Sequence, residues 1–425
     1  MVSPTSSPVW HPFTQHALDP APIPVARTEG AYLETPDGRR IIDGISSWWV
    51  VTHGHRHPKI VAAIQEAVAR LDQVIFAGFT HQPADDLARA LVELAPPGLT
   101  RVFYSDSGST AVEVALKMAL GTFRNEGAPR RRIIVMEGSY HGDTIGAMSV
   151  GARGVFNEAY EPLLFEVDRI PLPAPGRERE TLDALEALTR EGHAAALIVE
   201  PLVLGAGGML MYPPDVLADM AKLLRASDTL FIADEVMTGW GRTGTLFACE
   251  QAGVVPDILC TSKGLTGGTI PLAATLASER VYDAHFSADR TKTFYHSSSY
   301  TANPIACAAG LANIGIWRDE PVMARISALA GAQSERLADL ARRPGFVNAR
   351  RCGTITAIDL EGNARGYLAG IGPKLRDACL ARDVLLRPLG NIVYVMPPYC
   401  LAPEELDRVY DVLLRSIAGL GVNTL

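Results

Sequence analysis

The feature of this sequence that most constrains its fold is an alternation of short, continuously apolar runs with longer stretches of helical period. In 58–71, apolar side chains recur every three or four residues, which predicts an amphipathic helix. The apolar runs between such stretches include 101–104, 133–136, 196–199 and 230–233. Runs that are apolar throughout are typical of strands covered on both faces. The sequence therefore predicts an α/β fold, with a mostly parallel sheet flanked by helices.

The length of 425 residues indicates more than one structural unit. Residues 1–55 are expected to form an N-terminal arm with a hairpin at Thr35–Gly38, because Pro, Asp and Gly favour a tight turn. Residues 56–310 hold the predicted strands and form a large domain. From 311 to 425 the chain becomes more charged and helical and then returns to β-like segments, which predicts a smaller α+β domain. We assign the arm to this smaller domain.

Charge and cysteine usage exclude several classes of function. Acidic residues outnumber basic ones by 47 to 39, and the net charge of -8 argues against a nucleic-acid partner. No apolar run is long enough to span a bilayer, and the first residues lack the basic start and apolar core of a signal peptide. The six cysteines form no Cys-x-x-Cys pair, so we expect reduced thiols and no metal site. These features are typical of a cytoplasmic enzyme.

A phosphate-binding loop is predicted where Asp106–Thr110 connects a strand to a helix. Small residues with hydroxyls at a helix N-terminus suit an anion, because free backbone N–H groups and the positive end of the helix dipole face it. Gly108 and Ser109 are the candidate ligands. The alternative is that Thr110 and Glu113, three residues apart, form an ordinary capping box.

Two further candidates follow predicted strands. Asp234 comes directly after 230–233, at the carboxyl end of the strand, where open α/β sheets bind ligands. A buried carboxylate there needs a partner, and a protonated pyridine nitrogen is one, although capping the next turn is an equally ordinary role. Tyr140 in Tyr140–Asp143 follows 133–136 and can stack on a flat ring; the alternative is a half-buried turn residue.

Lys263 lies in the glycine-rich stretch Thr261–Gly268, after an apolar run. A lysine in such a loop is either a surface amine or a Schiff-base lysine, whose pKa must fall so that it reacts near neutral pH. Each of these signals has an ordinary structural alternative. Their order along the chain is far more specific: a phosphate loop, a stacking aromatic, a carboxylate for a pyridine nitrogen, and a lysine about thirty residues later.

With these motifs in this order, the sequence resembles the fold-type-I, class-III pyridoxal-phosphate aminotransferases over essentially its whole length. The resemblance implies a large cofactor-binding domain, a smaller α+β domain, and pyridoxal 5′-phosphate as the cofactor. The stretches that carry it are Trp10–Pro12, Ser46–Trp49, Tyr104–Met118, Tyr140–Ser149, Asp234–Glu250, Pro256–Gly268, Asn303–Cys307 and Arg387–Gly390.

The resemblance also implies a role for each candidate. Gly108 and Ser109 hold the cofactor phosphate. Tyr140 stacks on the pyridine ring, and Asp234 pairs with the ring nitrogen. Lys263 is the catalytic residue: it forms the internal aldimine with the cofactor and then shuttles a proton as general base and acid.

Within this family, the sequence resembles the branch that aminates 8-amino-7-oxononanoate to 7,8-diaminononanoate in biotin synthesis by a ping-pong reaction. The acceptor is a long apolar chain that ends in a carboxylate. Trp48 is expected to form an apolar wall for this chain, with Trp49 in the core. Arg387 is expected to bind the carboxylate in bidentate fashion; the alternative is a surface arginine. Tyr140 and Lys263 are expected to border the same substrate.

The resemblance further implies a homodimer. In this family the stretch that corresponds to His296–Tyr300 closes the phosphate site of the neighbouring subunit. By position, Ser298 and Ser299 are expected to contact the cofactor, and Ser297 the substrate.

The amino donor divides the family, and this sequence carries marks of both types. Phe13 and Ser299–Tyr300 resemble the members thought to use lysine. Trp48–Trp49 and Met396–Tyr399 resemble those that use S-adenosylmethionine. We expect S-adenosylmethionine, with Arg242 as a further candidate for orienting it. The remaining alternatives are another class-III ω-amino-acid transaminase and a catalytically silent cofactor-binding protein.

Overall fold

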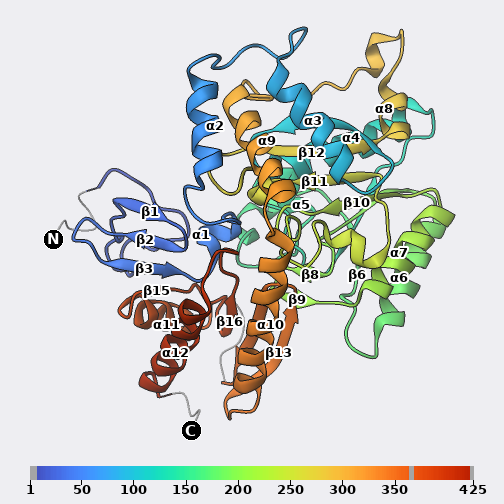
Figure 1. The fold of residues 1–425 in the computed structure, drawn as a ribbon. Helices are drawn as coiled ribbons and strands as arrows, with labels where there is room; N and C mark the ends of the chain where they lie inside the picture. The colour runs from blue at the N-terminus through green and yellow to red at the C-terminus, as the bar shows by residue number, and fades with distance from the viewer. Residues whose placement is uncertain (1–6, 363–367, 422–425) are drawn as a thin grey trace.

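A central seven-stranded sheet organises the chain (Figure 1). The structure, a computed structural model, describes residues 7–362 and 368–421. The strand order is β4-β12-β11-β10-β7-β5-β6, parallel from β11 to β6, with β12 antiparallel to both neighbours. The strands are β4 (Leu99–Ser105), β5 (Arg132–Met136), β6 (Asp168–Ile170), β7 (Ala194–Val199), β10 (Leu230–Asp234), β11 (Ile258–Thr261) and β12 (Ala273–Ser278). The predicted α/β fold with a mostly parallel sheet is confirmed.

The four apolar runs of the sequence fall on β4, β5, β7 and β10. Every residue of β7 and β10 is buried, as expected for strands covered on both faces. Strand β4 differs, because several of its side chains are partly or fully exposed. The reason is its place at the edge of the sheet, where it has only β12 as a neighbour.

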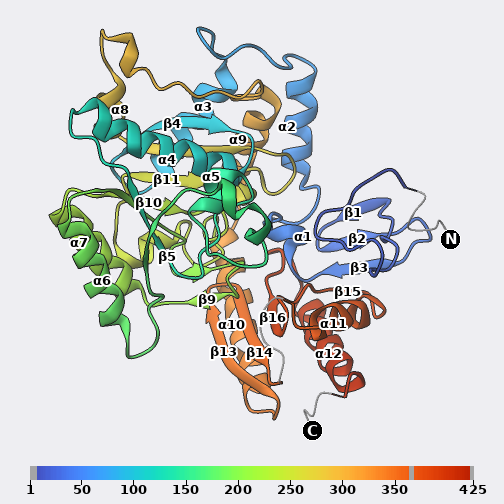
Figure 2. The ribbon, with the colours of Figure 1, turned by 180° about the vertical axis from the view of Figure 1, so that it is seen from behind.

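Helices pack around this sheet. Viewed from behind, α4 crosses the sheet, and it contacts β7, β11 and β12 (Figure 2). The helices α2 and α3 both pack on α9. The boundary expected after residue 310 falls inside α9. The helices of this part of the chain are α2 (Pro58–Val68), α3 (Gln82–Leu94), α4 (Gly108–Asn125), α5 (Ile145–Ser149), α6 (Glu178–Arg190), α7 (Pro214–Ala226), α8 (Glu279–His285) and α9 (Pro304–Asp319).

The two ends of the chain meet in a second sheet, of order β1-β2-β3-β15. Its strands are β1 (Arg27–Glu29), β2 (Tyr32–Glu34), β3 (Arg40–Asp43) and β15 (Val384–Leu385). The hairpin predicted at Thr35–Gly38 joins β2 to β3. This sheet lies beside α11 and α12 in both views (Figures 1 and 2). The other elements here are α10 (Val322–Ala341), α11 (Ile371–Leu380), α12 (Pro403–Gly419) and a three-stranded sheet of β13 (Phe346–Cys352), β14 (Ile355–Leu360) and β16 (Ile392–Val395).

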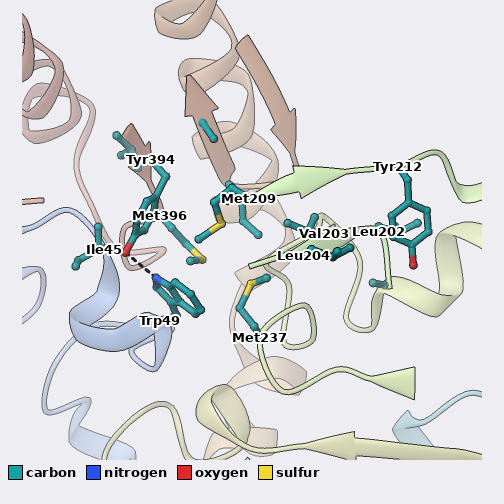
Figure 3. Close-up of a cluster of buried hydrophobic side chains, with 14 of the residues drawn as sticks. Ile45, Trp49, Leu202, Val203, Leu204, Met209, Tyr212, Met237, Tyr394 and Met396 are labelled. Atoms are coloured by element: carbon teal, nitrogen blue, oxygen red, sulfur yellow. Dashed lines mark hydrogen bonds between the residues drawn. The ribbon is translucent and has the colours of Figure 1, made fainter. Parts of the chain in front are cut away.

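A buried cluster joins the short helix α1 (Ser46–Trp49) to the C-terminal part of the chain (Figure 3). The indole of Trp49 donates a hydrogen bond to the hydroxyl of Tyr394 at 3.0 Å. Trp49 is 5% exposed and Trp48 is 41% exposed, which agrees with one tryptophan in the core and one available to a pocket. Positive φ angles at Ser47 and Trp49 break the regular helix here. In the part of the chain that the structure describes, no helix is long and apolar enough to cross a membrane.

Candidate active site

Lys263 begins the one-turn 3₁₀ helix η3 (Lys263–Thr266), directly after β11. Its φ of +32° is unusual for a residue with a side chain. Burial lowers the pKa of the Lys263 amine, while the charges of Asp234 and Glu200 oppose that shift. The Nζ atom lies 5.4 Å from the centre of the Trp49 ring. Lys263 is half-buried beside Trp49, and the lowered pKa enriches the neutral, nucleophilic form of its amine.

Asp234 is the last residue of β10, and its two oxygens have different partners. Oδ2 lies 2.7 Å from Nδ1 of the buried His141. Oδ1 accepts the backbone N–H of Val236 at 3.1 Å, so Asp234 also caps the turn that follows β10, which was the alternative interpretation. His141 was not among the sequence candidates, although it stands beside Tyr140 in the motif. Its hydrogen bond orients the carboxylate and leaves Asp234 able to meet a cation.

Glu200 is a second buried carboxylate that the sequence reasoning missed. It accepts the backbone N–H groups of Tyr140 and Gly205, both at 2.9 Å. The signal was available, because Glu200 follows the apolar strand β7 just as Asp234 ends β10. The two strands are parallel neighbours, so both carboxylates reach the same edge of the sheet.

The N-terminus of α4 meets the other turns of the site at this edge. Ala111 donates the first intrahelical bond, to Ser107, so the N–H groups of Gly108 and Ser109 precede the helical bonding pattern. A Cβ atom on Gly108 would lie 2.6 Å from the side chain of Val236, two residues after Asp234. The hydroxyl of Ser109 accepts the backbone N–H of Asp143 at 3.2 Å. The predicted phosphate loop therefore lies against both neighbouring motifs.

The alternative interpretation of this segment, a capping box between Thr110 and Glu113, is wrong. The box is formed by Ser107, which caps α4, and Thr110. Glu113 instead accepts hydrogen bonds from the hydroxyl of Thr144 at 2.7 Å and the backbone N–H of Gly146 at 2.8 Å. The carboxylate thus caps α5, because the fold brings the start of that helix alongside α4.

A row of aromatic rings leads from Tyr140 to Arg387. The ring of Tyr140 lies 6.3 Å from that of Phe156, which lies 6.0 Å from that of Phe13. Phe13 lies 5.3 Å from Trp48, and the guanidinium of Arg387 lies 5.1 Å over the Trp48 ring. Arg387 also donates to the carbonyl of Phe13 at 3.3 Å. The structure thus brings four sequence candidates together, and adds Phe156, which no sequence pattern had indicated.

Two other groups of candidates have different surroundings. Ser298 donates a hydrogen bond to the carboxylate of Asp106, at the entrance to α4, whereas Ser297 and Ser299 are exposed. Arg242 is buried and donates to the carbonyl of Val51 at 2.7 Å, two residues after Trp49. Its guanidinium therefore holds the backbone that follows the two tryptophans.

Comparison with known proteins identifies the family. A model of the class-III aminotransferases matches residues 13–417. This chain is a class-III aminotransferase. A protein of Synechococcus elongatus named adenosylmethionine-8-amino-7-oxononanoate aminotransferase is 49% identical, over 96% of this chain and 97% of its own. A protein of the same name from Geobacter sulfurreducens is 39% identical, over 96% and 95%.

Solved structures of aminotransferases share the fold. The crystal structure of adenosylmethionine-8-amino-7-oxononanoate aminotransferase from Methanocaldococcus jannaschii has a TM-score of 0.93 and 33% identity, covering 97% of both chains. An amine transaminase from an uncultivated Pseudomonas species, in its PLP-bound internal aldimine form, has a TM-score of 0.90 and 31% identity. It covers 97% of this chain, and the match spans 99% of the transaminase.

Class-III aminotransferases work with pyridoxal 5′-phosphate, and the site of this aminotransferase fits that group. The phosphate is an anion, and free N–H groups begin α4 at Gly108 and Ser109. The pyridine nitrogen needs a carboxylate, and Asp234 is oriented by His141 at the end of β10. The aldehyde needs an amine, and Lys263 supplies one with a lowered pKa.

The stability of this aminotransferase is expected to depend on Glu200. Burial raises the pKa of its carboxyl from 4.5 to about 7, and the charge of Asp234 adds to the shift. Between these two pH values the folded protein binds more protons than the unfolded chain, so stability falls as the pH rises. Between pH 4.5 and 7, the free energy of unfolding of cofactor-free wild type should fall by about 3 kcal/mol relative to Glu200→Gln.

Urea unfolding of both proteins across this pH range measures the effect. The control is Glu66→Gln, because the Glu66 side chain is 76% exposed and forms a surface ion pair with Arg70. A wild-type advantage over Glu200→Gln that stays constant or grows with pH would contradict the prediction.

Proposed function

We propose that this aminotransferase transfers the amino group of S-adenosylmethionine to 8-amino-7-oxononanoate, giving 7,8-diaminononanoate in biotin synthesis. The observation that carries the proposal is Arg387, held over the Trp48 ring at the end of an aromatic row that starts at Tyr140. An apolar chain with a terminal carboxylate matches this order of groups. The names of the relatives with 49% and 39% identity support the same substrates.

Each part of the acceptor has a counterpart in the row. The aliphatic chain would lie along Trp48 and Tyr140, with Phe13 and Phe156 excluding water from it. Its carboxylate would meet the planar guanidinium of Arg387, which can donate two parallel hydrogen bonds. The ketone at the other end of the chain would then face the amine of Lys263.

The remaining side chains would hold the cofactor and move protons. Bound pyridoxal phosphate supplies an electron sink for the carbon that loses its proton. Gly108 and Ser109 would bind the phosphate, with Ser298 and Ser299 of a second subunit. Asp234 would keep the ring nitrogen protonated. Lys263 would take the proton from the carbon that carries the amino group and deliver it to the carbon on the other side of the nitrogen, as base and then acid.

A homodimer in the cytoplasm belongs to the same proposal. Large apolar side chains are exposed in the loop before α3 and in the stretch before α9, namely Ile75, Phe79, Tyr295 and Tyr300. An exposed set of this kind is typical of a surface covered by a partner. A cytoplasmic location is supported by six cysteines that are all free.

The experiment that tests the substrates is a pair of half-reactions, followed through the visible band of the loaded enzyme. S-adenosylmethionine is expected to remove the band, and 8-amino-7-oxononanoate to restore it. Lysine, the alternative donor, is added in a separate sample. Removal of the band by lysine alone would overturn the donor, and failure of 8-amino-7-oxononanoate to restore it would overturn the acceptor.

Phe13 is the residue that favours the lysine alternative, because it sits in the row without a hydroxyl. If this position contacts the donor, Phe13→Tyr should raise kcat/KM for S-adenosylmethionine by about fivefold, the effect of one added hydrogen bond. The measurement is the rate of the donor half-reaction in wild type and variant. Phe165→Tyr is the control, since that phenylalanine is a partly exposed residue outside the row. An unchanged rate would mean that position 13 does not contact the donor.

Arg387→Leu is expected to weaken the acceptor half-reaction selectively. Loss of a charge-assisted pair should lower kcat/KM for 8-amino-7-oxononanoate by about 10- to 100-fold. The donor half-reaction should change little, because the proposed partner of Arg387 is the carboxylate of the acceptor. Rapid mixing of each substrate with the loaded enzyme separates the two rates. Arg382→Leu is the control, an exposed arginine near the end of α11, and equal losses in both half-reactions would contradict the assignment.

A further inference from the structure

The turn that carries Lys263 is held from outside by one buried amide. Asn313, in α9, donates both of its N–H groups to this turn, to the carbonyl of Gly264 at 3.0 Å and to that of Leu265 at 3.1 Å. Its side chain is completely buried. The carbonyl of Gly264 also accepts the backbone N–H of Gly267 at 3.0 Å, which closes the single turn of η3. At Leu265 the amide of Asn313 stands where a longer helix would supply a backbone donor. Asn313 thus ties the turn to α9.

Asn313 is in turn oriented by a histidine. Nε2 of His53 lies 2.9 Å from the Oδ1 atom of Asn313. The amide oxygen can only accept, so the proton of His53 is on Nε2. Burial lowers the pKa of His53 to about 3, so the ring stays neutral and keeps this single arrangement. Trp317 and Tyr399 pack against the ring, with centroids 5.4 and 6.4 Å away.

The same chain segment supports the other end of the turn. His53 follows Trp49 by four residues, and Val50 lies between them in sequence. A Cβ atom on Gly268 would lie 2.6 Å from the carbonyl of Val50, so the backbones are in direct contact there. The segment 49–53 therefore touches the turn at Gly268 and, through Asn313, at Gly264 and Leu265.

We propose that Asn313, oriented by His53, is a positioning residue that fixes the direction of the Lys263 side chain. The backbone of Lys263 has a positive φ, which a residue with a side chain keeps only when its surroundings enforce it. The two hydrogen bonds from Asn313 hold the carbonyls of the two residues that follow Lys263, which are Gly264 and Leu265. The inference rests on the proposed role of Lys263 and adds the residues that hold it in place.

The test compares Asn313→Ala and Asn313→Asp with wild type, all loaded with pyridoxal phosphate. Neither variant can donate to both carbonyls. We expect kcat to fall by about 10- to 100-fold, the effect of misplacing a reacting group by about 1 Å. KM for both substrates should change by less than about twofold, because Asn313 contacts neither. The circular dichroism of the visible band, which reports how the bound chromophore is held, should lose intensity.

Variants of His53 test the same positioning without changing a residue that contacts the turn through its own side chain. They replace the Asn313 variants if Asn313→Ala does not fold. His53→Leu removes the donor to Asn313 and should reproduce the loss of visible circular dichroism. His53→Gln restores an N–H at a similar reach and should recover most of it. Equal signals from His53→Leu and His53→Gln would overturn the proposed orientation by His53.

Gln333→Leu is the matched control. Gln333 is also a completely buried amide, and it donates to the carbonyl of Thr354 at 2.6 Å, within the C-terminal part of the fold. This variant should lower the melting temperature and leave kcat and the visible circular dichroism unchanged. Equal effects from Gln333→Leu and Asn313→Ala, or wild-type kcat and circular dichroism in both Asn313 variants, would overturn the inference. If Lys263→Ala is inactive while the Asn313 variants are normal, only this inference fails and the role of Lys263 stands.

Discussion

Lys263→Ala is expected to reduce turnover by about 10⁴-fold, the largest effect that loss of a proton-transferring side chain usually produces. The reason is that Lys263 supplies both the amine that would bind the cofactor and the base that would move the proton. Burial lowers the pKa of this amine, so a neutral base is available near neutral pH. The buried carboxylates Asp234 and Glu200 cannot replace it, because neither supplies an amine that can bond to the aldehyde of the cofactor.

Steady-state rates and the visible spectrum check this prediction together. The variant should lose the band of the cofactor joined to lysine while still binding pyridoxal phosphate through the start of α4. Lys222→Ala is the control, because that lysine is 75% exposed on α7 and forms a surface ion pair with Asp219. Wild-type turnover in Lys263→Ala would refute the central assignment.

Asp234→Asn is expected to lower kcat by about 10³-fold, since removing one partner of a buried ion pair costs about 3–5 kcal/mol. An amide cannot hold a proton on the ring nitrogen as a carboxylate does, so the cofactor would withdraw electrons less strongly. The amide oxygen can still accept the backbone N–H of Val236, and the NH₂ group can donate to Nδ1 of His141 when the proton of that ring is on Nε2, so the local structure should persist. The measurements are kcat and the amount of pyridoxal phosphate retained after dialysis.

The matched control is Asp257→Asn. Asp257 accepts the backbone N–H of Phe231 at 2.8 Å, near the start of the strand that Asp234 ends. It is half-buried and lies away from the edge that carries the site. This variant should lower stability and leave kcat within about twofold of wild type. A similar fall in kcat for both variants would show that the loss at Asp234 reflects general damage to the strand.

Much of the fold was predictable because its strands are continuous apolar runs. The runs at 133–136, 196–199 and 230–233 became β5, β7 and β10, which lie together in the parallel part of the sheet. Parallel strands align their carboxyl ends, so residues that follow such runs meet at one edge. That rule brought Asp234 and Tyr140 together, and it also applied to Glu200, which the sequence reasoning overlooked.

Other parts of the site depend on contacts between distant residues, for which the sequence has no local signal. His53 and Asn313 are separated by 260 positions, and Phe13 and Arg387 by 374. Phe156 lies in an irregular loop, where side-chain direction follows no period. The alternative of a capping box between Thr110 and Glu113 is a local pattern, whereas the actual partners of Glu113 begin at Thr144, 31 positions away.

The sequence by itself predicted the order of strands and helices along the chain, the residues that follow the apolar strands, and a candidate amine at Lys263, whose burial it left open. These properties follow from hydrophobic period and from the chemistry of single residues. Only the tertiary structure decided what surrounds them: the histidine on Asp234, the arginine over Trp48 and the amide beneath the turn of Lys263. Their partners are chosen by packing, and packing selects neighbours by shape and hydrogen bonding across the whole chain, whatever their separation in sequence.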